Sequence, residues 1–359
     1  MTTIYLDTSV AMAESFLKSP YCEAFLKACS IRQYNVVIPE IVIDELKGNF
    51  PKKLAEKVDS FEKSKKELSK LVEVKSESVD IPKVFTDYQD WLDDLLDDHG
   101  VAVTPYPEVD YKEIVEKYYS GKKPFKESGD GHKDYIVWKS IVSHIEGSNA
   151  SPPNIFLTNN TKDFCKKLDD DNFAIHPDLG ELLNKYANKP SIFTSIKNLF
   201  ECELSPKLEG MEIGDIANLG NQDIESMTGE FLLEDLPGRT IYGLEDVPFG
   251  NDISISSVGR HSIDSVSLKK VDNEVLIIVI GYVEIEVDGF VEKWSYYSME
   301  EDNPRMYVVD GEWNDHVMMV SSSVETIFNL TIFYSLDKNQ VTGHEVSLPQ
   351  EIEDEWPYK

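Results

Sequence analysis

The chain has 359 residues, which is long enough for two domains, and its 41% hydrophobic and 11% aromatic content excludes a disordered protein. Lys and Arg total 35 against 66 Asp and Glu, so the formal net charge is -31. This balance excludes a generally basic nucleic-acid coat protein, but it does not exclude a nuclease, whose metal-binding carboxylates themselves add negative charge.

Neither membrane insertion nor secretion is predicted. No run of about 18 apolar residues, the length that crosses a bilayer, occurs in the sequence. Residues 1–7 lack the basic region of a signal peptide. The four cysteines form neither a CxxC pair nor a zinc-binding spacing, which is typical of a reducing compartment. We therefore expect a cytoplasmic protein.

Up to about residue 188, short apolar runs alternate with long amphipathic stretches. Strands are expected at 4–6, 35–38 and 154–158, and helices at 9–30, 40–73, 82–98, 110–119 and 133–146. Strands that alternate with helices need crossover connections, so this half is predicted to be an α/β fold with a mostly parallel sheet covered on both faces. Ligands of such sheets bind beyond the carboxyl ends of the strands.

The second half has a different pattern. Residues 189–235 are predicted to be a connector with one or two short helices, and period-two alternation begins at about 236. A strand at 274–287 leads to Asp288-Gly289, a strong hairpin turn signal, and a returning strand at 290–297. Further strands are expected at 305–309, 315–323, 326–336 and 341–348. Residues 236–359 are therefore predicted to form an antiparallel β-rich domain.

Charge is shared unevenly along the chain. Residues 1–188 hold 24 Lys and Arg against 33 Asp and Glu, a net charge of -9, which leaves -22 for the remainder. Residues 47–75 hold nine lysines and five acids. If phosphate is bound anywhere, we therefore expect it beside the first half. For the acidic β-rich domain we expect a protein partner or an oligomer contact.

Two acids early in the chain lie at positions suited to a site. Asp7 closes the first strand and leads through Thr8 and Ser9 into a helix. Glu45 shares a helical face with the apolar Ile41, where a carboxylate is costly unless it is paired or metal-bound. Helix capping by Asp7 and an ion pair between Glu45 and a following lysine are the alternatives.

Further oxygen donors lie later in the first half. Asp134 opens an apolar helix after a glycine-flanked turn that contains Asp130, which is the weaker candidate. Asn160 and Asp163 follow the strand that ends at Thr158, and both can turn toward the strand end. The alternatives are stabilisation of a helix N-terminus and ordinary turn chemistry.

Together, these positions place oxygen donors at three or four carboxyl-end positions of one sheet. Carboxylates that converge repel one another, which is hard to explain without a divalent cation. A site made only of oxygen donors favours Mg²⁺ or Mn²⁺ over Zn²⁺. One or two such ions would activate a water molecule and neutralise the charge that develops on a phosphodiester.

The ordered set of motifs resembles the PIN-like nuclease family over about residues 1–185. The matching pieces are Tyr5–Ser9, Ile38–Leu46, Lys133–Asp134 and Leu157–Phe164. The resemblance implies a Rossmann-like three-layer α/β/α PIN domain over residues 1–188, with a long helical insertion at 47–125. It also implies a Mg²⁺- or Mn²⁺-dependent ribonuclease in which Asp7, Glu45 and Asp134 are carboxylates of the metal centre.

The chain departs from the family at the fourth position. Many PIN domains have an acid two residues after the threonine, where this chain has Asn160, with Asp163 three residues further on. The amide oxygen of Asn160 can bind Mg²⁺ but adds no charge, so Asp163 is the better candidate for supporting a second metal ion. Asp163 therefore joins the expected catalytic set.

The resemblance predicts an endoribonuclease that leaves 5′-phosphate and 3′-hydroxyl ends, in the toxin or anti-phage setting in which members of the family often act. The residues expected at the substrate are Thr8, Ser9, Thr158, Lys133, Lys52 and Lys53, although Lys52 and Lys53 equally fit a solvated helix face. A catalytically degenerate PIN fold that serves as a scaffold and a structure-specific DNA nuclease are the alternatives.

Overall fold

The computed structural model describes residues 2–73, 78–126, 130–148, 153–169, 172–183, 189–216, 219–241, 253–298 and 306–349. The chain divides into two compact units, Met1–Lys207 and Leu208–Lys359. This division lies inside the predicted connector 189–235, because the first part of that segment adds a strand to the sheet of the first unit. The predicted boundary at residue 188 lies outside the described residues.

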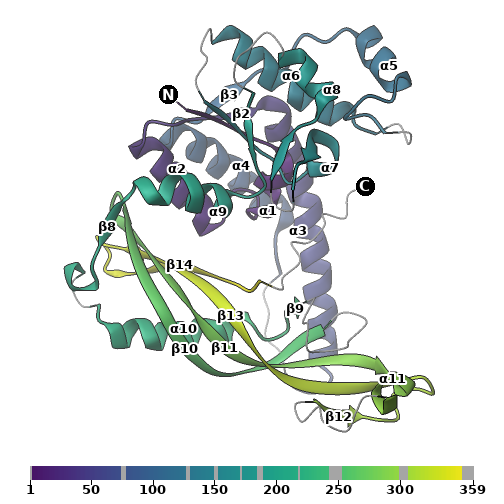
Figure 1. The fold of residues 1–359 in the computed structure, drawn as a ribbon, viewed down its shortest axis with the longest axis vertical. Helices are drawn as coiled ribbons and strands as arrows, with labels where there is room; N and C mark the ends of the chain where they lie inside the picture. The colour runs from purple at the N-terminus through teal and green to yellow at the C-terminus, as the bar shows by residue number, and fades with distance from the viewer. Residues whose placement is uncertain are drawn as a thin grey trace. The chain divides into compact units, whose positions relative to one another are not determined.

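The first unit is built on a five-stranded parallel sheet with the order β3-β2-β1-β4-β7 (Figure 1). Its strands are β1 (Thr3–Leu6), β2 (Asn35–Pro39), β3 (Ala102–Thr104), β4 (Asn154–Leu157) and β7 (Ser191–Phe193). Every residue of β1 and β4 is buried, so both faces of the sheet are covered. The predicted α/β class with a parallel sheet is therefore confirmed.

Helices connect these strands. They are α1 (Thr8–Ala13), α2 (Pro20–Ile31), α3 (Glu40–Leu68), α4 (Ile81–Asp98), α5 (Tyr111–Tyr119), α6 (His132–Gly147), α7 (Thr161–Phe164), α8 (Pro177–Gly180) and α9 (Ile196–Leu199). Single turns η1 (Glu181–Leu183), η2 (Phe200–Leu204) and η3 (Ser205–Lys207) and a hairpin of β5 (Cys165–Lys167) with β6 (Phe173–Ile175) complete the unit. The candidate site residues lie at or near the ends of these elements.

The single helix predicted over 9–30 is wrong, because α1 ends at Ala13 and α2 begins at Pro20. Between them the backbone φ is positive at Ser15, Phe16 and Leu17, at 50°, 61° and 68°. The hydroxyl of Ser19 accepts a hydrogen bond from an N–H in the first turn of α2. A proline directly after this cap starts a new helix, since it lacks the N–H that a continuing helix would use.

The predicted insertion at 47–125 contains a strand as well as helices. Ala102, at the start of β3, pairs in parallel with Val37 of β2, so β3 forms an edge of the main sheet. Three residues are too few for a strand pattern to be recognised in the sequence. The helical part is held by stacked rings of Phe50 on α3 and Tyr88 on α4, whose centroids lie 3.9 Å apart.

The second unit is an antiparallel sheet with the order β12-β13-β11-β10-β8, in which β14 also pairs with β13 and β9 with β10. Its strands are β8 (Glu209–Met211), β9 (Thr240–Ile241), β10 (Ile253–Val271), β11 (Glu274–Glu292), β12 (Met306–Asp310), β13 (Val317–Ser335) and β14 (Gln340–Ser347). The turn η4 (Ile213–Asp215) and the helices α10 (Asn221–Asp235) and α11 (Lys293–Ser298) accompany it. Ile224 and Leu232 of α10 pack into one core with Ile277 and Leu330. The predicted antiparallel β region is confirmed.

The hairpin turn predicted at Asp288-Gly289 is wrong. β11 continues through both residues and pairs with β13 over its full length of 19 residues. The turn lies instead between β10 and β11, where Asp272 has a φ of 54°. Cross-strand pairing over this length outweighs a two-residue turn preference. For the same reason the predicted strands 315–323 and 326–336 are one strand, β13, and the predicted strand 290–297 is divided between β11 and α11.

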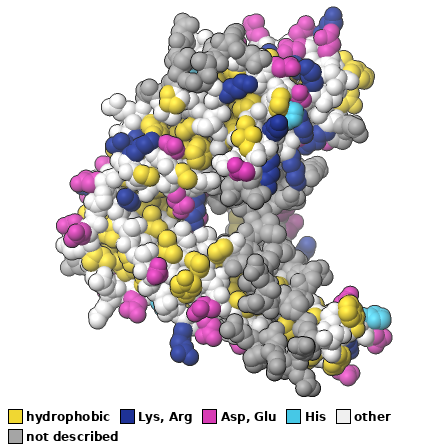
Figure 2. Space-filling view, in the orientation of Figure 1, with side chains coloured by type: hydrophobic (Ala, Val, Ile, Leu, Met, Phe, Trp, Pro, Cys, Tyr) yellow, Lys and Arg dark blue, Asp and Glu magenta, His cyan; other side chains and the backbone are white. Residues whose placement is uncertain are grey.

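The two units differ in charge. Residues 1–207 contain 27 Lys and Arg against 35 Asp and Glu, whereas residues 208–359 contain 8 against 31. Basic side chains are accordingly numerous over the first unit in the space-filling view (Figure 2). None of the helices in the described part of the chain has the length and apolarity that crossing a membrane would need.

Candidate active site

Asp7 lies at the carboxyl end of β1, directly before α1. Its backbone N–H donates to the carbonyl oxygen of Leu157 at 2.9 Å, which continues the pairing of β1 with β4. The Asp7 side chain is buried, with the residue only 3% exposed, and its Oδ2 accepts hydrogen bonds from the hydroxyls of Ser9 at 2.6 Å and Thr158 at 2.8 Å. Two neutral donors therefore hold this carboxylate at the end of the strand.

Glu45 approaches from α3, which begins directly after β2. The buried Leu46 fixes this part of the helix in the core, while the Glu45 side chain stays 17% exposed. Its Oε2 accepts a hydrogen bond from Thr8 Oγ1 at 2.6 Å, and its Oε1 pairs with Lys133 Nζ at 2.9 Å. An ion pair was one of the sequence alternatives for Glu45, but the lysine comes from α6 and not from the residues that follow on α3.

Asp134 occupies the first turn of α6, after the cap residue Gly131 with a φ of 110°. Its Oδ1 accepts a hydrogen bond from Nδ2 of Asn160, the cap residue of α7, at 3.1 Å. Asn160 therefore turns its amide nitrogen, and not its oxygen, toward Asp134.

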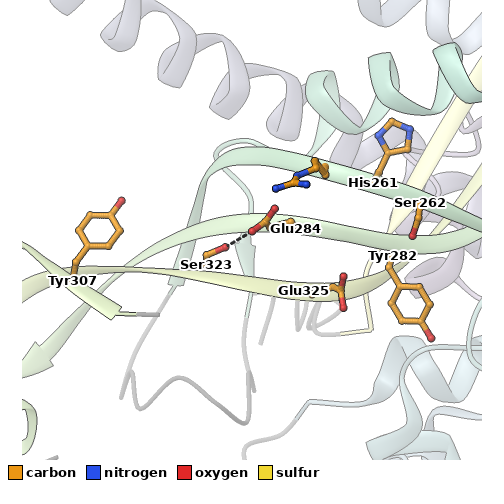
Figure 3. Close-up of a pocket in the computed structure, with 8 residues that line it drawn as sticks. His261, Ser262, Tyr282, Glu284, Tyr307, Ser323 and Glu325 are labelled. Atoms are coloured by element: carbon orange, nitrogen blue, oxygen red, sulfur yellow. Dashed lines mark hydrogen bonds between the residues drawn. The ribbon is translucent and has the colours of Figure 1, made fainter. Parts of the chain in front are cut away.

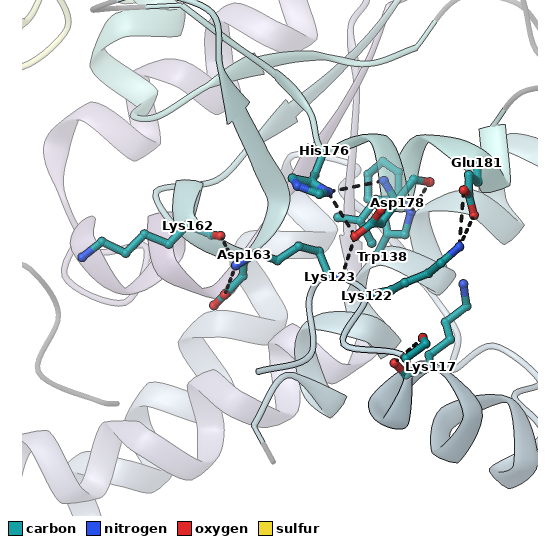
Figure 4. Close-up of polar contacts among 11 residues, drawn as sticks. Lys117, Lys122, Lys123, Trp138, Lys162, Asp163, His176, Asp178 and Glu181 are labelled. Atoms are coloured by element: carbon teal, nitrogen blue, oxygen red, sulfur yellow. Dashed lines mark hydrogen bonds and ion pairs between the residues drawn. The ribbon is translucent and has the colours of Figure 1, made fainter. Parts of the chain in front are cut away.

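Asp163, on α7, is almost fully buried, with 2% of the residue exposed. Its Oδ2 lies 2.6 Å from Nζ of Lys126. Lys123 Nζ lies 3.5 Å from Oδ1, which is buried and has no hydrogen-bond partner. The backbone carbonyl of Lys162 accepts a hydrogen bond from Lys123 Nζ at 2.7 Å (Figure 4).

The four carboxylates interact electrostatically. Burial raises the pKa of Asp134 to about 7, and the negative charges of Asp7, Asp163 and Glu45 add to this increase, whereas Lys126 opposes it. Burial also raises the pKa of Asp7, against the hydrogen bonds from its two hydroxyl donors. Like charges raise carboxylate pKa values in this way only when the groups lie near one another. The four side chains, which come from the end of β1 and from α3, α6 and α7, therefore converge on one region.

A family model described as a PIN domain matches residues 4–164. Residues 4–164 form a PIN domain. The PIN domain contains all four carboxylates, and the family is one of metal-dependent nucleases that generally use divalent cations. No curated protein and no solved structure matches the chain.

The donors of this PIN domain have the chemistry that a hard divalent cation prefers, since they offer oxygen atoms alone. The buried Asp163 Oδ1 without a hydrogen-bond partner is a position that a cation would satisfy. As the described side chains lie, no group of three or more His, Cys, Asp or Glu encloses a metal-sized site. Lysines contact Glu45 and Asp163, so Asp7 and Asp134 are the carboxylates that would hold an ion.

Four further predicted residues lie among these carboxylates. Thr8, Ser9 and Thr158 donate their hydroxyls to Glu45 or Asp7. The fourth is Lys133, which pairs with Glu45. All four thus support the carboxylates of the PIN domain directly.

The other predicted residues lie elsewhere. Lys52 is seven residues beyond Glu45 on α3, which is about 10 Å along a helix, and Lys53 pairs with Glu56 at 3.6 Å. Asp130 is exposed, and its backbone carbonyl accepts the N–H of Lys126 at 3.1 Å.

Sequence reasoning missed Lys123 and Lys126, which contact Asp163. Both belong to the lysine-rich run 122–126, which was assigned largely to the insertion. Three lysines within five residues, directly before the turn that leads to Asp134, were the only sequence signal that could have indicated them.

The second unit has a separate hollow of about 880 Å³ beside β10, β11, β12 and β13 (Figure 3). Arg260, Tyr282, Glu284 and Glu325 are among the residues that line it, and Ser323 donates to Glu284 Oε1 at 3.0 Å. One arginine and two glutamates line it, so charges of both signs face this hollow. None of its residues belongs to the PIN domain.

Proposed function

We propose that the PIN domain is an endoribonuclease that hydrolyses RNA phosphodiester bonds with Mg²⁺ or Mn²⁺. The observation that carries the proposal is a hydrogen-bonded network in which Thr158 joins Asp7 to Asn160, and Asn160 donates to Asp134. Thr8, the residue after Asp7, donates to Glu45. The charges of Asp7, Asp163 and Glu45 add to the raised pKa of Asp134. Buried carboxylates that repel one another are costly unless a cation offsets the repulsion. Hydrolysis of a phosphodiester is chemistry that uses such a cation.

The residues of the chain would supply position and charge. When bound, the cation would polarise a phosphoryl oxygen and lower the pKa of a bound water molecule. Ser9 and Thr158 hold Asp7 in one orientation, and Asn160 does the same for Asp134. Oxygen donors fixed before the substrate arrives need no reorganisation during the reaction. Attack of water on phosphorus would break the bond to the 3′ oxygen, which takes a proton and leaves as a hydroxyl.

Substrate contacts are proposed at two places. Lys133 is 59% exposed beside Glu45 and would reach a phosphate at the centre. Lys52 and Lys53, further along α3, would meet the RNA backbone. If they do, K52A and K53A should each reduce the slope of log affinity against log salt concentration by about 1. An unchanged slope assigns both lysines to a solvated helix face.

A catalytically degenerate PIN domain that serves as a scaffold is the competing proposal. The ion pairs of Glu45 with Lys133 and of Asp163 with Lys126 favour it, because they neutralise two carboxylates without a metal. Incubation of the purified full-length protein with Mn²⁺ and a generic RNA decides between the two. Cleavage that D7N abolishes supports the ribonuclease, and intact RNA supports the scaffold. Parallel incubations with DNA test the third possibility, a DNA nuclease.

We propose a toxin or anti-phage defence setting, because members of the family that the chain resembles often act in one. The four cysteines are free thiols, which supports a reducing, cytoplasmic location. The acidic second unit favours a protein partner or an oligomer contact over RNA. Pull-down of the full-length chain with and without RNA would test whether a protein partner binds it.

A further inference from the structure

Three lysines place ammonium groups on the carboxylates of the proposed centre. Lys126 Nζ lies 2.6 Å from Asp163 Oδ2, and Lys123 Nζ lies 3.5 Å from Oδ1 of the same side chain. Lys133 Nζ lies 2.9 Å from Glu45 Oε1. Two of the four carboxylates therefore already have cationic partners that are covalently part of the chain.

The loop that carries Lys123 and Lys126 is anchored by contacts outside the centre (Figure 4). The backbone N–H of Lys123 donates to Asp178 Oδ2 at 3.0 Å, and Lys122 Nζ lies 3.1 Å from Glu181 Oε2. These contacts direct the loop toward Asp163 without any help from a bound ion.

Packing fixes the rest of this loop. Phe125 is buried, and its ring centroid lies 5.4 Å from that of Tyr135 on α6. Gly131 lies so close to the loop that an added Cβ would be 2.3 Å from the carbonyl oxygen of Pro124. The ammonium of Lys126 is therefore held at Asp163 by a backbone that has little room to move.

Asp7 and Asp134 have a different environment. Asp7 accepts from the hydroxyls of Ser9 and Thr158, and Asp134 accepts from the amide of Asn160. These donors orient the carboxylates but add no positive charge. The four acids thus divide into a lysine-paired set, Glu45 and Asp163, and a set held by neutral donors, Asp7 and Asp134.

The charge count favours one exchangeable cation. When all four carboxylates are ionised, as metal binding requires, they and the three ammonium groups leave one net negative charge. One bound divalent cation would change the net charge of the centre to one positive charge. A second bound cation would change it to three positive charges. Such an excess is unfavourable because like charges a few ångströms apart repel strongly in a partly buried site.

We propose that Lys126, supported by Lys123, takes the place of a second metal ion, so that the centre holds one exchangeable divalent cation at Asp7 and Asp134. This inference rests on the proposed function, since it concerns the same centre. The ammonium of Lys126 is a permanent positive charge beside the position of the cation, available to the phosphate group of an RNA substrate. Asp163 Oδ1 has no hydrogen-bond partner, and the Lys123 ammonium lies 3.5 Å from it.

Metal stoichiometry tests this inference independently of cleavage. The metal-free, full-length protein is titrated with Mn²⁺ by isothermal calorimetry, and free Mn²⁺ is counted by electron paramagnetic resonance. The wild type should bind one Mn²⁺ per chain, and K126M should bind two because Asp163 Oδ2 loses its ammonium partner. K126R keeps the charge and should bind one. K122M is the matched control, since Lys122 lies in the same loop but pairs with Glu181.

Two Mn²⁺ ions in the wild type, or one in a K126M protein that melts within a few degrees of the wild type, would overturn the inference. If K126M does not fold, K126Q replaces it, since Gln can still donate to Asp163 without carrying a charge. The two proposals can fail separately. If the wild type binds one Mn²⁺ and K126M binds two, but the wild type leaves RNA intact, the ribonuclease proposal is refuted and the role of Lys126 is kept. If the wild type cleaves RNA but binds two Mn²⁺ ions, the ribonuclease proposal is kept and the role of Lys126 is refuted. If no variant binds Mn²⁺, both proposals are refuted.

Discussion

Thr158 donates a hydrogen bond to Asp7 Oδ2 at 2.8 Å, although 151 residues separate them in the chain. The parallel register of β1 and β4 places Leu6 opposite Leu157, so the next residue of each strand meets its neighbour at the same edge of the sheet. The contact is thus a direct consequence of strand order. It links the first and last motifs of the PIN domain.

Replacing Thr158 with Val should weaken both the fold and the activity. Val has nearly the same shape but lacks the hydroxyl, so a buried carboxylate oxygen loses one of its donors, at a cost of about 1–3 kcal/mol. Because Asp7 also loses a positioning contact, RNA cleavage should fall about tenfold or more. Urea unfolding and initial cleavage rates measure the two effects. T158S keeps the hydroxyl and should resemble the wild type, and equal behaviour of T158V and T158S would contradict this account.

Asp7→Asn should remove activity while preserving the fold. The amide has almost the same size as the carboxylate but lacks its charge, and we expect cleavage to fall by at least about 100-fold. Stability should stay the same or increase, because a buried carboxylate with a raised pKa is lost. Circular dichroism, melting curves and cleavage of labelled RNA check these outcomes. D87N, at an exposed position on α4, is the control. A fully active D7N protein would remove Asp7 from the site.

Much of the fold could be predicted because its core strands follow simple patterns. The apolar runs at 4–6, 35–38 and 154–158 are indeed the central strands β1, β2 and β4. β3 and β7 could not be predicted, since strands of three residues have no recognisable period. The turn expected at Asp288-Gly289 failed because local turn preference carries no information on the long partner strand β13.

The site could be predicted only in part. Asp7 and Asp163 come after strands, Asp134 lies in the first turn of a helix, and Glu45 shares a helical face with Ile41 just after a strand. Sheet topology was therefore enough to propose that they converge. Which cations reach them depends on how a loop folds back from outside the sheet, and Lys126 reaches Asp163 from such a loop. A contact of this kind produces no periodic pattern in the sequence from which it could be predicted.

Gly131→Ala should destabilise the PIN domain and loosen the lysine loop. Gly131 has a φ of 110°, which is strained for an L-residue, and its Cβ would lie 2.3 Å from the carbonyl oxygen of Pro124. The two effects together should cost about 2 kcal/mol or more. Thermal melting of the full-length protein measures the loss. G121A has a positive φ but nothing within 4 Å of its Cβ, so it should cost less. If G131A is as stable as G121A, the close approach to Pro124 does not constrain the loop.

The metal-free protein should become less stable as pH rises from about 4 to about 7, in part because of Asp134. Its pKa is raised from 3.8 to about 7 in the folded state, so the folded protein binds this proton more tightly than the unfolded chain does. The free energy of unfolding therefore decreases with pH across this window, by on the order of 4 kcal/mol at most. Mn²⁺ affinity should increase over the same window, since binding must displace the proton.

Comparison of the wild type with Asp134→Asn isolates this contribution. The amide does not titrate, so the difference in unfolding free energy between the two proteins should grow in favour of the variant as pH rises, while their other titrating groups largely cancel. Chemical denaturation at a series of pH values between 4 and 8, in the presence of a chelator, gives this difference. A difference that stays constant with pH would mean that Asp134 titrates near its ordinary value. The carboxylates would then lie too far apart, or too well solvated, to act as one metal centre.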